Sequence, residues 1–236
     1  MAERGVAPSP APAGLPAGTL SEPLAARTTG RFHLVPGAAG SPLLLGFHGY
    51  GESAGSVLGE LVRLPGLAGW SFAAVEALHP FYTRRGEVVR SWMTREDREH
   101  AIADNLAYVR DVLRRLADLC PYPWWAACGF SQGAAMAWRA AVDGAGGSAT
   151  AAPCRAVVAL GGDVPPDLDD LAALPVARAL LGRGSDDEWY TPEKLAADRA
   201  RLRVRGLTPE VCEFPGGHEW TSSFREAAGA FLRGLD

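Results

Sequence analysis

The sequence Gly129-Phe130-Ser131-Gln132-Gly133 decides the fold that we expect for this chain. An apolar run precedes it and an alanine-rich segment follows it, an order that predicts a strand, a sharp turn and a helix. A serine at such a turn has a strained backbone, and the flanking glycines leave room for the neighbouring strand and helix. The turn would bring the serine hydroxyl and the first helical N–H groups to one point, where they stabilise negative charge. The alternative is a turn in which Ser131 only caps the helix.

Length and composition suit one large domain with a tail. The 236 residues are 47% hydrophobic, and a net charge of −4 without a polybasic run gives no reason to expect nucleic-acid binding. Residues 1–26 are rich in Ala, Pro and Gly, so we expect a flexible N-terminal tail followed by a single domain over 27–236. No segment approaches the roughly 20 apolar residues of a membrane span, and no signal peptide is evident, so the expected location is cytoplasmic.

Strand-like and helix-like segments alternate from residue 31 onward. Apolar runs predict strands at 31–35, 42–47, 70–75, 124–128, 156–160, 176–181 and 210–214. Helical patterns cover 57–64, 102–116, 134–142, 191–206 and 224–232. This alternation predicts an α/β fold with a mostly parallel central sheet and helices on both faces. The segment 79–96 is long for a connection, and we expect it to be a loop that forms a wall or lid.

Reactive residue types follow several of the predicted strands, at the edge where such folds bind ligands. A serine hydroxyl needs a neighbouring base, and histidine suits this role because its pKa lies near 6.5. Of the five histidines, His218 follows the last strand on a glycine-flanked loop and is the expected base, with His79 as a weaker alternative. Four carboxylates compete to orient His218: Asp163, Asp186, Asp187 and Glu188.

Two backbone N–H groups are expected to stabilise an oxyanion beside Ser131. One comes from Gln132, directly after the serine, and the other from Tyr50 in the glycine-rich loop that follows the strand 42–47. The expected substrate pocket is lined by His48, Trp92, Met93, Trp189 and Trp220, with core packing as the alternative for each tryptophan. No metal or nucleotide cofactor is expected, because no phosphate loop or His-Glu-x-x-His sequence appears.

These motifs resemble the phospholipase/carboxylesterase branch of the α/β-hydrolases, which includes acyl-protein thioesterases and small bacterial esterases. The matching pieces extend from about residue 30 to the C-terminus and are 47–51, 91–93, 129–133, 183–187 and 217–220. The resemblance implies the α/β-hydrolase fold and places the acid on Asp187, through a His-Gly-x-x-Asp motif in which this chain has Arg183 for the histidine. Trp189 and Tyr190 replace the small residue and proline usual in the thioesterases, which favours a small bacterial esterase.

The leading hypothesis is a serine hydrolase that cleaves a small-molecule carboxylic ester through an acyl-enzyme. Ser131 would attack the acyl carbon, His218 would transfer the proton and Asp187 would orient His218. One alternative is a non-catalytic homologue that binds a small molecule. Another is a thioester or dienelactone-type hydrolase, although dienelactone hydrolases usually carry cysteine where this chain has Ser131. Exposed tryptophans would be compatible with a homodimer.

Overall fold

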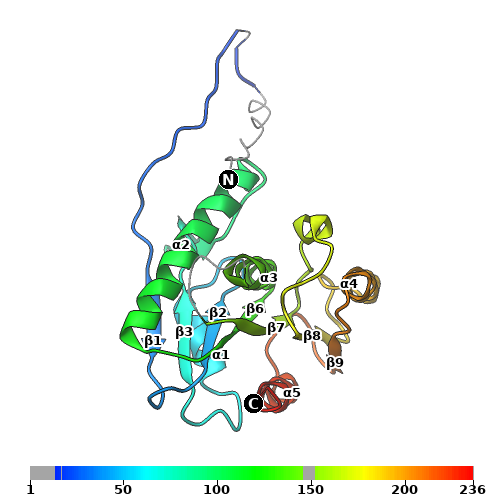
Figure 1. Cartoon of the computed structure of the whole chain (residues 1–236). Helices are drawn as coiled ribbons and strands as arrows, with labels where there is room; N and C mark the ends of the chain where they lie inside the picture. The colour runs from blue at the N-terminus through cyan, green and yellow to red at the C-terminus, as the bar shows by residue number, and fades with distance from the viewer. Residues whose placement is uncertain (1–13, 17, 146–151, 236) are drawn as a thin grey trace.

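A seven-stranded sheet lies at the centre of the computed structural model, which describes residues 14–16, 18–145 and 152–235 (Figure 1). Its strands are β1 (Phe32–Val35), β2 (Leu43–Phe47), β3 (Ser71–Val75), β6 (Trp125–Phe130), β7 (Cys154–Leu160), β8 (Arg178–Gly184) and β9 (Glu210–Phe214). They are arranged in the order β1-β3-β2-β6-β7-β8-β9. Neighbouring strands are parallel except for β1, which pairs antiparallel with β3. The prediction of a mostly parallel sheet is confirmed.

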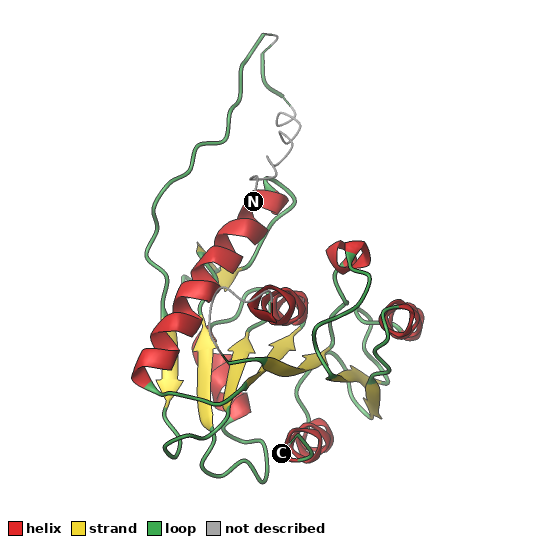
Figure 2. Ribbon diagram, viewed as in Figure 1, coloured by secondary structure: helices red, strands yellow, loops and turns green. Residues whose placement is uncertain are grey.

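Helices cover both faces of this sheet (Figure 2). They are α1 (Ala54–Leu61), α2 (Arg98–Leu119), α3 (Gln132–Ala145), the 3-10 helix η1 (Pro166–Asp170), α4 (Pro192–Val204) and α5 (Ser222–Arg233). Buried residues of α2, α3 and α4 form one hydrophobic core, and those of α1 and α5 form a second. Strand β2 contributes alternately to both, because successive strand side chains point to opposite faces: Leu45 enters the first core and Leu44 the second.

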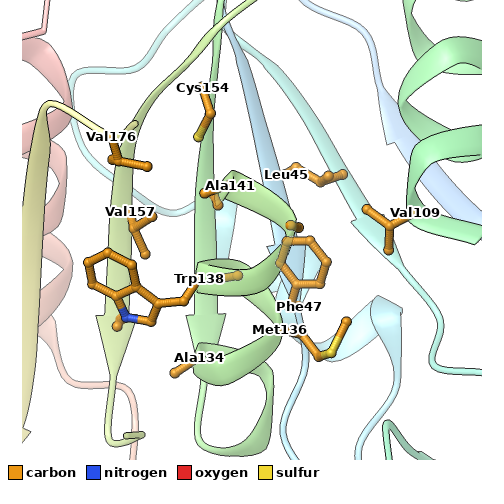
Figure 3. Packing of buried hydrophobic residues seen from close by; sticks show 14 of the residues in the cluster. Leu45, Phe47, Val109, Ala134, Met136, Trp138, Ala141, Cys154, Val157 and Val176 are labelled. Carbon is orange, nitrogen blue, oxygen red and sulfur yellow. The ribbon is translucent and has the colours of Figure 1, made fainter. Parts of the chain in front are cut away.

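Helix α3 packs directly on the central strands of the sheet, and its buried side chains belong to the first core. Figure 3 shows Met136 and Trp138 of α3 among the side chains of β2 and β7, including Phe47 and Val157. Both α3 side chains are fully buried. Burial of apolar side chains of this size contributes about 1.5–3 kcal/mol each. The helix that follows Ser131 is therefore held firmly against the sheet.

The segment 79–96 differs from its prediction as a loop, because most of it forms a β-hairpin. Strands β4 (His79–Tyr82) and β5 (Val88–Ser91) pair antiparallel in a separate two-stranded sheet. Aromatic and β-branched residues on both sides of a turn at Gly86 (φ +80°) favour such a hairpin. The residues after β5 lead into α2, and Met93, Thr94 and Arg95 among them line the cavity described below.

The predicted N-terminal tail lies partly outside the described residues, which omit 1–13 and 17. Residues 18–29 are exposed and run as a long loop beside α2 (Figure 2). The loop reaches β1 next to Tyr108, whose hydroxyl donates a hydrogen bond to the carbonyl of Arg31. Within the described part of the chain, no helix combines the length and apolar character needed to cross a membrane.

Candidate active site

Ser131 occupies a sharp turn between β6 and α3. Its φ is +53°, a strained value for a residue with a side chain. The Ser131 N–H donates to the carbonyl of Leu160 in β7 (2.8 Å), which fixes the turn against the sheet. A Cβ at Gly133 would lie 2.1 Å from the carbonyl oxygen of Phe47, and one at Gly129 would lie 2.3 Å from the oxygen of Gly133. Only glycine fits at these two positions, as the sequence predicted.

His218 and Asp187 form a hydrogen-bonded pair beside this turn. The imidazole Nδ1 of His218, in the loop between β9 and α5, lies 2.8 Å from Oδ2 of Asp187. The other carboxylate oxygen accepts the backbone N–H groups of Trp189 (2.8 Å) and Tyr190 (2.9 Å). Asp187 is buried, and its acceptor oxygens require that Nδ1 carry the proton. The second imidazole nitrogen, Nε2, is thereby the one left to accept a proton.

Gly161, at the end of β7, forms the surface against which this pair packs. Its φ is +62°, and a Cβ there would lie 3.0 Å from Cε1 of His218 and 3.3 Å from Oδ2 of Asp187. The ring of Phe130 lies on His218 with the centroids 4.9 Å apart. The imidazole is therefore fixed by one hydrogen bond and by packing.

The competing acids lie elsewhere. Asp186 and Glu188 flank Asp187 in sequence but are exposed. Asp163 follows β7 and pairs with Lys194, with the charged atoms 3.6 Å apart. Among the four candidates, Asp187 alone makes a hydrogen bond to His218 in the described structure.

The loop between β2 and α1 carries Tyr50, the expected source of one oxyanion N–H. A carboxylate that the sequence analysis missed shapes this loop: Oε2 of Glu52 accepts the N–H of Gly49 (2.8 Å). Glu52 also forms a β-bridge with Arg90 of the hairpin. Partial burial raises the pKa of Glu52. Its position three residues after Gly49, directly after the matching piece 47–51, is the sequence signal that could have identified it.

His48 supports the same loop but does not line the cavity. Its Nδ1 donates to the carbonyl of Gly49 (2.7 Å) and its Nε2 accepts the N–H of Ala77 (3.2 Å). These two partners require the neutral imidazole, and burial lowers the pKa of His48 accordingly. The prediction of His48 as a pocket residue is wrong, because its fully buried side chain links β2 to the end of β3.

A cavity of about 550 Å³ opens in front of Ser131. Ser131, Gln132 and His218 line it together with Tyr50, Met93 and Trp189. Among the described residues, no three His, Cys, Asp or Glu side chains come together as a potential metal site. The serine, the histidine and both expected oxyanion residues thus line one cavity. Two of the five expected pocket residues, Met93 and Trp189, line it as well.

Two tryptophans predicted to line this cavity pack elsewhere. Trp92 is fully buried, and its indole N–H donates to the carbonyl of His48 (2.8 Å). Trp220 packs against Phe130 and Phe224 on the other face of the sheet. Both tryptophans therefore belong to the hydrophobic cores, and core packing was the alternative expected for them.

The side chain of Gln132 holds the segment after β5 that lines the cavity. Its Oε1 accepts the backbone N–H of Trp92 (2.9 Å), and its Nε2 donates to the carbonyl of Met93 (2.9 Å). The residue after Ser131 thus aligns the segment that follows β5. Sequence reasoning expected the backbone N–H of Gln132 to act and did not foresee this contact.

Arg183 stands where the resembled family's acid motif has histidine. Its guanidinium donates to the carbonyls of Ser185 (3.0 Å) and Tyr190 (2.9 Å) and pairs with Glu213 (3.1 Å). These contacts connect both ends of the turn that holds Asp187. Arg183 therefore supports the turn that carries the acid.

Sequence comparison identifies the family. A family model described as serine hydrolase (FSH1) matches residues 62–220, more than half of the chain and a range that includes Ser131, Asp187 and His218. The chain belongs to the FSH1 serine hydrolases. This membership confirms the predicted serine hydrolase chemistry. A search of the curated proteins found no match for this FSH1 hydrolase.

Solved structures confirm the α/β-hydrolase fold of this family member. Esterase PE8 has 25% sequence identity and a TM-score of 0.64, with 89% of this chain and 100% of that chain covered. Zea mays acyl-protein thioesterase 2 has 18% identity and a TM-score of 0.64, covering 88% of this chain and 99% of its own. A Bacillus cereus carboxylesterase has 15% identity and a TM-score of 0.62, covering 88% and 95%. The last two show similarity of fold alone.

Proposed function

We propose that this FSH1 hydrolase cleaves carboxylic esters through an acyl-enzyme, with Ser131 as nucleophile, His218 as general base and Asp187 as the orienting acid. Ser131 attacks the ester carbonyl while His218 Nε2 accepts its proton and then returns it to the leaving alcohol. Water, activated by the same imidazole, hydrolyses the acyl-enzyme and releases the acid. The relationship to esterase PE8, at 25% identity over 89% of this chain, favours an ester substrate.

The observation that carries this proposal is the pairing of a buried acid with the one histidine that shares a cavity with the strained serine. His218 and Ser131 line the same cavity, and the Nδ1 of His218 is held by Asp187 at 2.8 Å. Within the described residues, no hydrogen bond joins Ser131 to His218. That contact is often long before a substrate binds.

The backbone N–H groups of Tyr50 and Gln132 form the proposed oxyanion hole. Among the described residues, neither has a hydrogen-bond acceptor in the protein, and both residues line the cavity. Gln132 begins α3, so its N–H also lies at the positive end of the helix dipole. Each such donor typically contributes about 3 kcal/mol to stabilisation of the transition state.

The dienelactone-type alternative would require a thiol nucleophile, and the nearest cysteine in sequence does not suit one. Cys128 is fully buried in β6, and burial raises the pKa of its thiol. The burial of this thiol supports Ser131 as the proposed nucleophile.

A labelling experiment tests the proposal. Wild type and Ser131→Ala would be treated with a fluorophosphonate probe and assayed with p-nitrophenyl esters of increasing acyl length. We expect labelling and turnover in the wild type and loss of both in Ser131→Ala. Ester turnover by a folded Ser131→Ala variant would refute the mechanism. Binding of these esters by the wild type without labelling or turnover would instead support a non-catalytic receptor.

A further inference from the structure

The four consecutive charged residues 95–98 lead from the β5–α2 connection into the start of α2, and the fold separates them by sign. Arg95 and Arg98 line the cavity in front of Ser131. Glu96 and Asp97 line a different groove, beside the N-terminal segment. A charge run of this kind is usually a solvated face. Here it presents cations to the cavity and carboxylates away from it.

Local backbone geometry produces this separation. Asp97, the residue directly before α2, adopts a left-handed conformation (φ +47°). The carbonyl of Asp97 accepts the N–H of Ala101 (2.9 Å) and so starts the helix. Upstream, the Gln132 side chain holds Met93. The backbone that carries the two arginines is thus anchored on both sides.

The other charged groups around the cavity already have partners. Lys194 pairs with Asp163 at 3.6 Å. Arg139 makes two hydrogen bonds to Asp167 (2.7 and 2.8 Å), and this contact, against the effect of burial, lowers the pKa of Asp167. Arg98 lies near enough to Asp167 to add to that effect.

Arg95 and Arg98, unlike Lys194 and Arg139, have no such partner among the described residues. In the part of the chain that the structure describes, neither guanidinium makes an ion pair or a hydrogen bond within the protein. The cavity therefore has a surplus of positive charge next to the serine. It also has an apolar side, formed by Met93 and by Trp189, whose side chain is 73% exposed.

We propose that the substrate of this hydrolase is an ester that carries a second, anionic group, a carboxylate or a phosphate, and that Arg95 and Arg98 bind this group. A guanidinium binds a carboxylate or phosphate through two parallel hydrogen bonds, so arginine suits this role better than lysine does. The ester carbonyl lies at Ser131 and the connecting chain lies against Met93. This inference rests on the proposed esterase function and specifies its substrate class.

Two esters of the same carbon number test it: p-nitrophenyl hexanoate and the mono-p-nitrophenyl ester of adipic acid, which adds a carboxylate at the far end. The specificity ratio is kcat/KM for the adipate ester divided by kcat/KM for the hexanoate ester, after subtraction of spontaneous hydrolysis. We expect the double variant Arg95→Gln/Arg98→Gln to lower this ratio about tenfold, because both contacts are charge-assisted but partly screened by solvent. We also expect the wild-type ratio to fall with added salt.

The matched control is Arg84→Gln/Arg85→Gln, which removes the same charge from exposed residues at the turn of the hairpin, away from the cavity lining. We expect its ratio to equal that of the wild type. Free adipate should inhibit hexanoate hydrolysis by the wild type and by this control, but much less in the Arg95/Arg98 variant. An unchanged ratio and unchanged inhibition in a folded Arg95/Arg98 variant would overturn the inference and leave the esterase function intact. Absence of both labelling and turnover in the wild type would refute the esterase function and this inference with it.

Discussion

Replacement of Asp187 by asparagine tests the proposed mechanism most sharply, because the geometry dictates how the amide must lie. Two backbone N–H groups, those of Trp189 and Tyr190, point at Oδ1 (2.8 and 2.9 Å). The amide oxygen must take that position, since an NH₂ group there would face two donors. The NH₂ group must then face Nδ1 of His218, which becomes an acceptor and leaves its proton on Nε2.

An imidazole in this tautomer cannot accept the proton of Ser131. The same replacement in a serine protease with this arrangement lowers kcat about 10⁴-fold. At about 1.36 kcal/mol for each factor of ten, the barrier rises by about 5.5 kcal/mol. We expect a loss of similar size in Asp187→Asn, because the carboxylate is buried and water cannot replace it. The measurement is kcat with a p-nitrophenyl ester, with thermal unfolding to establish that the variant is folded.

Asp186→Asn provides the matched control, since it changes the preceding, exposed carboxylate in the same turn. We expect its kcat to lie within about twofold of the wild type, as for most surface substitutions. A folded Asp187→Asn variant that retains a tenth or more of wild-type kcat would refute the assignment of the acid. If Asp163→Asn instead caused the large loss, the acid would be the one that follows β7.

Two further changes test the supports of the site. In the folded protein the pKa of His48 lies below its ordinary value of about 6.5, so the unfolded state binds the proton first as the pH falls. The free energy of unfolding should therefore fall as the pH drops below about 6.5. Denaturant titrations at pH 5–8 should show that His48→Gln flattens this dependence. Gly133→Ala should destabilise the fold by about 3 kcal/mol, because its Cβ would lie 2.1 Å from the Phe47 carbonyl oxygen, whereas Gly59→Ala, with open space around it, should not. An unchanged melting temperature in Gly133→Ala would contradict the steric argument.

Local sequence patterns were sufficient to predict those features of the fold and the site that depend on residues close together in the sequence. The sharp turn at Ser131 could be predicted, because the two positions at which a Cβ would clash lie two residues away on either side and are both glycine. The parallel sheet could be predicted because its strands are continuous apolar runs, as expected for strands buried on both faces. The choice of Asp187 among neighbouring carboxylates needed a family resemblance, since composition gives Asp186 the same chemistry.

Side-chain direction could not be predicted in the same way. Trp92 and Trp189 are both tryptophans in connecting segments near the site, yet one is 0% and the other 73% exposed. The difference arises from distant partners: the Trp92 indole N–H reaches the carbonyl of His48, and its backbone is held by Gln132. Such contacts join residues about forty positions apart, beyond the reach of any periodic pattern.

The charged residues 95–98 extend this argument from packing to specificity. Arg95, Glu96, Asp97 and Arg98 follow one another, and a run of charged residues is usually a solvated face. The left-handed turn at Asp97 places the two arginines, but neither carboxylate, on the cavity. If the proposed anionic substrate is correct, substrate choice in this hydrolase depends on the conformation of one non-glycine residue outside the catalytic machinery. An Asp97→Gly variant, which keeps the turn, should then retain the preference for the adipate ester better than Asp97→Val, whose branched side chain disfavours a positive φ.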